Sequence, residues 1–140
     1  PVRRAVARFG ARASAFPQAP LAEFIASGDF ARHLRRMRRI YAGRRAELVK
    51  VLEAVFGPGV LIPSQRDAGM HLVASLGGPL AGMSDVEAAE RAAAVGIRIE
   101  ALSRYYFAPP VREGLLLGFA GMDAEEMRLA AADLRRALMG

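Results

Sequence analysis

The chain has 140 residues, of which 53% are hydrophobic, and it contains no cysteine. This size and composition suit a globular protein with a real core, and the lack of cysteine excludes disulfides, thiolate metal sites and a cysteine nucleophile. The formal charge of +6 would suit a polyanionic partner, but 14 acidic residues are interspersed among the 20 basic ones, and charge alone is a weak sign of nucleic-acid binding. No apolar run approaches the roughly 20 residues of a membrane helix and no export leader is visible, so we expect a cytoplasmic protein.

The first part of the chain is predicted to be helical. Alanine and arginine are frequent in residues 2–13 and predict a helix, which Pro17 and Pro20 end. A short helix is expected in the segment LAEFIASG, where Gly28 closes it. Asp29 is then in position to cap the next helix.

That next helix is long and amphipathic. Its apolar residues recur at spacings of three, four or seven from Phe30 to Val55, and the segment FGPG ends it. Its polar side carries seven arginines: Arg32, Arg35, Arg36, Arg38, Arg39, Arg44 and Arg45. No helix-turn-helix spacing, zinc-ligand pattern or zipper accompanies them, so we interpret this side as solvated or partner-facing and do not assign it to reading DNA.

From residue 60 onward the pattern predicts strands as well as helices. Residues 60–62 and 70–76 are short apolar runs bounded by proline and glycine, which indicates two strands. Ser84 and Glu87 form the spacing of a capping box that opens a helix, and Gly96 ends it. The segments IRIEAL and LLLGFAG predict two more strands, and Asp123 with Glu126 opens a last helix.

The order after the N-terminal helices is therefore β-β-α-β-β-α. This order suits an α+β fold with a small, mostly antiparallel sheet that has helices on one side. We divide the chain into a helical connector, residues 1–56, and an α+β domain, residues 57–140.

Few residues carry recognisable chemistry. His33 and His71 have no partner at metal-ligand spacing, and structural or surface roles are expected for both. Lys50 is the only lysine, and its position three residues after Glu47 on the long helix predicts an exposed side chain with no role as a Schiff-base amine. We expect no catalytic residue and no metal site in this chain.

The segment LSRYYFAPPVRE is the most site-like part of the sequence, because loops between strands often carry function. Arg104 and Arg112 could bind a carboxylate or phosphate, and Tyr105 with Tyr106 could form an aromatic wall beside a small anion. In the alternative interpretation, the tyrosines pack against the sheet edge and the arginines are solvated. We take Arg104 and Tyr105 as candidate substrate- or effector-binding residues.

Three segments, in this order, are similar to a known family: LAEFIASGDFARHLRRMRRIYAGRRAEL, AGMHLVASL and ALSRYYFAPPVREGLLLGFAGM. They resemble the C-terminal part of MocR-type regulators, a subfamily of GntR transcriptional regulators whose effector region is similar to a fold-type I, pyridoxal-phosphate-dependent aminotransferase. The likeness runs from about Leu21 to the end of the chain. Aminotransferases of the 2-aminoadipate and kynurenine type share the layout more loosely.

This resemblance implies that the chain is an aminotransferase-like small domain, preceded by a helix that leads out of a large domain. It implies that the parent protein binds pyridoxal 5'-phosphate in the large domain, binds DNA through an N-terminal winged-helix domain and forms a homodimer. The Schiff-base lysine and the other cofactor-binding residues belong to those other parts. No cofactor-binding residue is therefore assigned in this chain, and the fragment alone is expected to catalyse nothing.

One position departs from the enzymes of this shape. The strand that matches GLLLGFA typically carries an arginine that grips the substrate α-carboxylate, and Leu116 stands at that position here. The departure favours a regulator, although Arg104 could supply a substitute grip if its loop faces the cofactor cleft. The alternative is the C-terminal fragment of a class I/II aminotransferase that acts on amino acids. A free-standing basic nucleic-acid module is a third interpretation, and it rests on charge alone.

Overall fold

The computed structural model describes residues 16–65 and 69–140 of the chain. The helix expected over residues 2–13 therefore lies outside the described residues. The chain divides into two compact units, one ending at Arg38 and the other running from Arg39 to Gly140, and this division falls within the long helix. The domain boundary expected near residue 56 stays a prediction.

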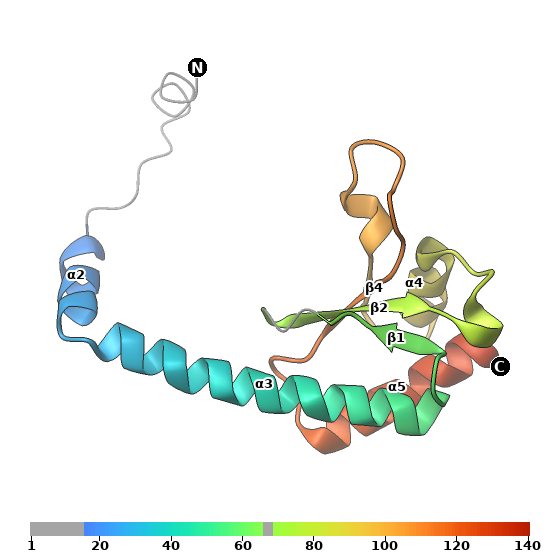
Figure 1. Cartoon of the computed structure of the whole chain (residues 1–140), viewed down its shortest axis with the longest axis horizontal. Coiled ribbons are helices and arrows are strands. Elements are labelled where there is room, and N and C mark those ends of the chain that lie inside the picture. Colours follow the sequence, from blue (N-terminus) through green and yellow to red (C-terminus); the bar gives the residue numbers. More distant parts are fainter. Residues whose placement is uncertain (1–15, 66–68) are drawn as a thin grey trace. The chain divides into compact units, whose positions relative to one another are not determined.

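The first unit contains α2 (Gln18–Ala26) and the beginning of α3 (Asp29–Phe56) (Figure 1). The short helix expected in this region is confirmed. It begins before Pro20, because proline is tolerated in a first helical turn, where its missing N–H costs no hydrogen bond. Gly28 follows α2 with φ +80, the left-handed conformation that favours glycine after a helix. Asp29, expected as the cap of the next helix, is already its first residue.

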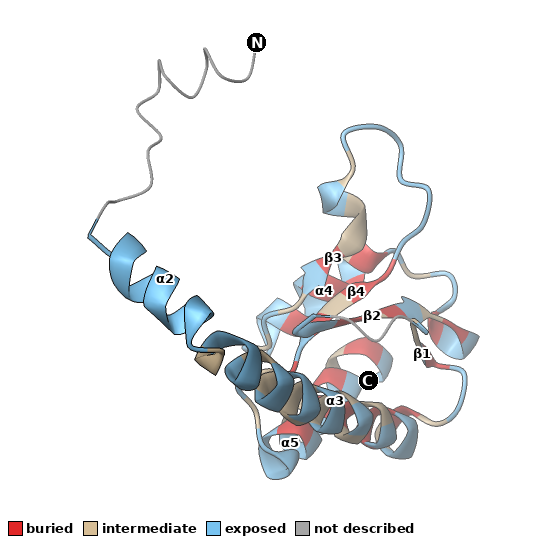
Figure 2. Cartoon of the chain, turned by 60° about the vertical axis from the view of Figure 1, so that its left-hand side comes forward, coloured by how far each residue is buried: buried red, intermediate tan, exposed pale blue. Residues whose placement is uncertain are grey.

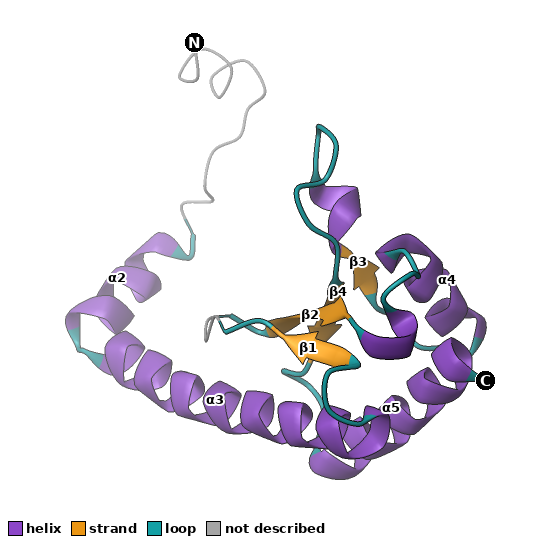
Figure 3. Cartoon of the chain, turned by 45° about the vertical axis from the view of Figure 1, so that its right-hand side comes forward, coloured by secondary structure: helices purple, strands orange, loops and turns teal. Residues whose placement is uncertain are grey.

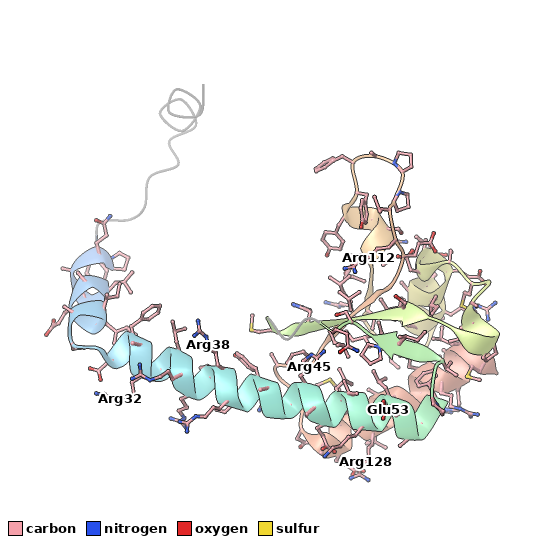
Figure 4. All side chains as sticks on the ribbon, in the orientation of Figure 1. Arg32, Arg38, Arg45, Glu53, Arg112 and Arg128 are labelled. Carbon is pink, nitrogen blue, oxygen red and sulfur yellow. The ribbon has the colours of Figure 1, made fainter. Side chains whose placement is uncertain are left out.

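The helix α3 has the predicted amphipathic pattern over its 28 residues. Its C-terminal turns bury four apolar residues in the second unit: Leu48, Val51, Leu52 and Phe56. Two arginines of the same helix bind backbone carbonyl groups. Arg45 donates from Nη2 to the carbonyl oxygen of Ser64 at 2.6 Å (Figure 4). Arg44 donates to the carbonyl oxygen of Ala120. Part of the basic run thus ties α3 to loops beside the sheet.

The rest of the second unit contains the sheet and two further helices. Its elements are β1 (Leu61–Pro63), β2 (His71–Leu76), the 3-10 helix η1 (Gly78–Leu80), α4 (Asp85–Ala94), β3 (Glu100–Ala101), the 3-10 helix η2 (Leu102–Tyr105), β4 (Leu115–Gly118) and α5 (Ala124–Met139). The strands form one four-stranded sheet in the order β1-β2-β4-β3, and every neighbouring pair is antiparallel. The predicted α+β class with a small antiparallel sheet is confirmed.

One face of the sheet forms the core of this unit. The inward-facing residues are buried: Leu61, Leu72, Ala74, Leu115 and Leu117. They share one apolar cluster with residues of α3, α4 and α5. On the other face His71 and Ser75 are exposed, while Val73 and Leu116 are half-buried. The helices therefore cover one side of the sheet, as predicted (Figure 3).

The strand expected over IRIEAL is much shorter than predicted. The amide of Ile97 donates to the carbonyl of Ala92 at 3.0 Å, which holds this residue against the end of α4 and away from the sheet. Pairing with β4 therefore starts only at Glu100. It ends after Ala101, because the amide of Ser103 donates to a side chain of α4 and the backbone turns into η2.

The two predicted helix caps are found, with one difference. Asp123 and Glu126 form a complete capping box at the start of α5. The hydroxyl of Ser84 accepts a hydrogen bond from the amide of Glu87 at 3.1 Å and so caps α4. The carboxylate of Glu87 does not return this bond, because it pairs with Arg91 at 2.7 Å. No helix of the described residues combines the length and the apolar character needed to cross a membrane.

Candidate functional site

The candidate site is the connection between β3 and β4, residues 102–114, which we call the 102–114 loop. It begins with η2 and projects from the sheet (Figure 1). Its two ends lie side by side, because the amide of Leu102 donates to the carbonyl of Gly114 at 2.8 Å. The loop thus resembles a long hairpin. We call its two joined ends, at residues 102–103 and 114, the neck, and the part that lies farthest from the sheet the tip.

The tip of the 102–114 loop is open to solvent (Figure 2). Phe107 is fully exposed, Val111 is 88% exposed and Tyr105 is 62% exposed. Tyr106 is half-buried. The two tyrosines therefore differ. Tyr106 is partly packed, as in the alternative interpretation given above, whereas the exposed ring of Tyr105 can contact a partner or ligand.

Arg104 lies at the base of the same loop. Its Nη2 pairs with Oε1 of Glu90 on α4 at 3.2 Å, and both side chains are at least half exposed. Such a surface pair contributes about 1 kcal/mol or less, so a carboxylate or phosphate ligand could replace Glu90. Arg112 is exposed on the other arm of the loop and makes no ion pair within the described ranges (Figure 4).

Asp85, which the sequence did not single out, lies beneath this loop. It is fully buried, and it is the only charged side chain in the core of the described residues. Its carboxylate accepts hydrogen bonds from the amide of Ser103 at 2.8 Å, from the hydroxyl of Ser103 at 2.6 Å and from the amide of Gly114 at 3.0 Å. Burial raises the pKa of Asp85, but hydrogen bonds from Ser103, Gly114 and the amide of Val86 outweigh it and hold the pKa below its usual value.

Leu116 occupies the middle of β4, on the open face of the sheet. It lies opposite Val73 of β2 and Glu100 of β3. Directly paired residues on one face of a sheet have neighbouring side chains. The position expected to hold a carboxylate-binding arginine in an enzyme is therefore apolar here, and a cross-strand neighbour carries a negative charge.

The other candidates from the sequence lie apart from this loop. Lys50 is exposed on α3, and the ion pairs of the described residues do not include one with Glu47. His33 and His71 are both exposed. Across the ranges that the structure describes, no group of three or more histidine, aspartate or glutamate side chains is arranged to hold a metal ion.

Two cavities among the described residues of the second unit are lined by neither Arg104 nor Tyr105. The larger has a volume of about 270 Å³ and lies between α3, α5 and residues 96–99, with mostly apolar walls. The smaller, of about 160 Å³, lies beside Glu113 and Gly114. Lys50 lines neither cavity. Neither of these two cavities therefore presents the lysine amine that a Schiff base with pyridoxal phosphate needs.

The arrangement of helices and sheet is that of part of an aminotransferase. The chain matches the α-aminoadipate aminotransferase LysN of Thermus thermophilus, complexed with N-(5'-phosphopyridoxyl)-L-leucine, with a TM-score of 0.68 and 22% identity over 84% of this chain and 29% of that one. It matches the kynurenine aminotransferase of Pyrococcus horikoshii, complexed with PMP, with a TM-score of 0.68 and 20% identity over 82% of this chain and 28% of that one. The fold expected from the sequence is confirmed.

The sequence itself is related to regulators. It is 37% identical over 137 residues to the probable rhizopine catabolism regulatory protein MocR of Rhizobium meliloti, which covers 98% of this chain and 27% of that protein. Two uncharacterized HTH-type transcriptional regulators of Bacillus subtilis strain 168, YhdI and YdeL, are each 29% identical, over 98% and 89% of this chain and 28% and 26% of their own length. No family model matches the chain.

The chain therefore spans about a quarter of the length of the curated relatives that it matches. Within that span, its sequence is similar to MocR and other HTH-type regulators, and its fold is similar to part of an aminotransferase.

Proposed function

We propose that this chain is the C-terminal, aminotransferase-like small domain of a transcriptional regulator that binds pyridoxal 5'-phosphate and DNA. The observation that carries the proposal is the identity of 37% to MocR across 98% of the chain. The parent protein binds DNA through a winged-helix domain and the cofactor through a large domain, both outside this segment. It acts in the cytoplasm as a homodimer. Lys50 takes no part in holding the cofactor, because it is exposed on α3.

The 102–114 loop is the part of this domain that contacts the effector. Tyr105 supports this role because its ring is largely exposed. Arg104 supports it because, among the described residues, its guanidinium group pairs with the exposed Glu90. An arginine fork beside a tyrosine suits a carboxylate, so the effector is an amine or amino acid that carries one.

The surroundings of Leu116 favour a regulator over an aminotransferase. An enzyme acting on amino acids needs a cation for the substrate α-carboxylate, and β4 offers a leucine with Glu100 across from it. The carboxylate of Glu100 would repel an anionic group at that point. Binding of an effector without repeated turnover fits this arrangement better than transamination does.

Fluorescence anisotropy tests the proposal by measuring the affinity of the whole protein for the DNA upstream of its gene. The protein is loaded with pyridoxal phosphate, and L-glutamate is added as the probe effector. We expect L-glutamate to change the DNA affinity. Arg104→Gln should weaken this response about tenfold without changing the affinity for DNA in the absence of effector, since a lost charge-assisted hydrogen bond is worth roughly 1.5–3 kcal/mol. Arg128→Gln, on the exposed surface of α5, is the matched control. An intact response in Arg104→Gln would remove this loop from the site.

A further inference from the structure

The neck of the 102–114 loop is closed by one buried carboxylate. Ser103 begins the outgoing arm of the loop and Gly114 ends the returning arm, and both donate backbone amides to Oδ2 of Asp85. The hydroxyl of Ser103 donates to Oδ1. A single side chain of α4 thus joins the two arms and the helix, while residues 104–113 lie beyond the neck.

The chemistry of a carboxylate suits this position. An ionised carboxylate only accepts hydrogen bonds, and its two oxygens can take four, so the three donors of the loop neck and the amide of Val86 converge on Asp85 without conflict. Burying a charged carboxylate without such partners would cost a large desolvation free energy, and the hydrogen bonds to Asp85 offset this cost. The second link between the loop and α4, from Arg104 to Glu90, is exposed and therefore weak.

Gly114 makes the closure tighter. A Cβ atom at this position would lie 3.0 Å from the carbonyl oxygen of Ala74 and 3.3 Å from Cγ1 of Val73. The returning arm therefore passes close to β2, where a side chain would have to displace its neighbours. The carboxylate and this close approach together fix where the loop leaves the sheet.

We propose that Asp85 is the positioning residue of the candidate effector site: by closing the loop neck from α4, it fixes Arg104 and Tyr105 relative to the sheet. The assignment of an effector to these two residues rests on the proposed function, whereas the closure of the neck does not. Asp85 acts through Ser103 and Gly114 and needs no contact with the effector itself.

The first test uses the 140-residue chain and needs neither cofactor nor effector. Asp85→Asn replaces one acceptor oxygen by an NH₂ group that faces donors. Amide hydrogen exchange should show at least about tenfold less protection at Ser103 and Gly114, with Leu72 and Leu117 of the core unchanged. Glu90→Gln is the control and should leave all four amides unchanged. Unchanged protection at Ser103 and Gly114 in Asp85→Asn would overturn the proposal.

A second variant covers the case in which Asp85→Asn does not fold. Ser103→Ala removes one of the three donors and keeps both backbone hydrogen bonds. Ser103→Ala should also reduce the protection of the Gly114 amide, by a smaller factor than Asp85→Asn does. It should raise the mobility of Arg104 and Tyr105 in ¹⁵N relaxation measurements. A loss of protection spread evenly over the core amides would show a merely structural role and contradict the proposal.

The link to the site is tested in the whole protein with L-glutamate as the probe. Asp85→Asn should weaken glutamate binding about tenfold and leave the visible absorbance of the bound cofactor unchanged. Unchanged glutamate affinity together with an open neck would overturn the positioning role. If the unaltered whole protein does not bind glutamate, the proposed effector site fails, and the exchange experiment still decides whether Asp85 closes the neck.

Discussion

At the scale of single residues, Gly77 shows how a missing side chain can be required by packing. Gly77 is buried where β2 meets η1, and its amide donates to the carbonyl of Val60 at 2.8 Å. A Cβ atom there would overlap the carbonyl oxygen of Gly59 and lie 2.9 Å from Cδ1 of Ile62. This oxygen belongs to the backbone, so it cannot move aside as the end of a flexible side chain could.

We expect Gly77→Ala to lower the free energy of unfolding by roughly 1–3 kcal/mol, the usual cost of forcing an extra carbon into a packed site. Urea denaturation measures this. Gly82→Ala is the matched control, because nothing lies within 4 Å of a Cβ atom there, and its effect should stay within about 0.5 kcal/mol. Equal stability of the two variants would show that the chain next to Gly77 is looser than described.

Asp85 makes stability depend on pH in a defined direction. Its pKa lies below the usual 3.8 in the folded chain, because the hydrogen bonds to its carboxylate outweigh the effect of burial. A carboxyl with a lowered pKa stabilises the fold at pH values above its usual pKa and loses this contribution as the pH falls through the folded value.

The difference in unfolding free energy between the natural chain and Asp85→Asn should therefore be largest above about pH 5, at roughly 1–3 kcal/mol, and should shrink steadily below pH 4. Chemical denaturation across this range measures it. Asp133→Asn, which breaks only an exposed pair with Arg136, should cost far less. A constant difference from pH 7 to pH 3 would contradict this account of Asp85.

The sequence could not reveal Asp85, because an acidic residue directly after a capping serine is ordinary at a helix start. Its partners lie 18 and 29 residues further along the chain, and only the tertiary fold brings them together. Arg104 and Tyr105 were visible as candidates because residues of this kind in a loop stand out locally. Their environments differ, because Arg104 pairs with Glu90 whereas Tyr105 is largely exposed. This difference depends on where α4 packs.

At the scale of elements, local signals predicted the helices well. The period of apolar residues in α3 and the capping box of α5 are properties of short segments, and both are confirmed. The length of β3 depends on distant partners: α4 holds Ile97, and Asp85 takes the amide of Ser103. Where tertiary contacts limit strand pairing, the length of the strand cannot be predicted from the alternation of apolar and polar residues alone.

The exposed arginines of α3 lead to a further prediction. Arg44 and Arg45 bind backbone carbonyls, whereas Arg36 and Arg39 are exposed. We expect the 140-residue chain to bind duplex DNA weakly, with equal affinity for different sequences, since no docking frame accompanies the charge. If Arg36 and Arg39 contact phosphates, changing both to Gln should reduce the slope of log K against log salt by about 0.9 per lost contact.

Arg128→Gln on α5 serves as the control for this measurement, because Arg128 is exposed and already paired with Glu125. Its salt dependence should equal that of the natural chain. A preference for one duplex that persists at physiological salt would show that α3 reads DNA directly.

At the scale of the whole molecule, the described part of the first unit exposes an apolar surface. Leu21 is 49% exposed, and the rings of Phe24 and Phe30, which meet edge to face with centroids 5.9 Å apart, are 39% and 36% exposed. Exposed apolar surface of this kind is typical of a contact with another domain or with a second copy of the chain. The same surface should make the 140-residue chain self-associate.

Sedimentation at increasing concentration measures this association. Changing both Phe24 and Phe30 to Ser should raise the dissociation constant at least about tenfold, since each removes buried apolar area from the contact. Leu129→Ser changes an exposed apolar residue of α5, outside this surface, and should have no effect. A chain that is monomeric at every concentration would show that this surface needs no cover.

We propose that the parent protein regulates transcription and does not act as a transaminase. The most direct test supplies the whole protein with pyridoxal phosphate, an L-amino acid and 2-oxoglutarate, and measures in one preparation the release of new 2-oxo acid and the affinity for upstream DNA. We expect specific DNA binding that responds to the amino acid, with no more than one equivalent of 2-oxo acid per subunit. Sustained release over many turnovers, without specific DNA binding, would contradict it.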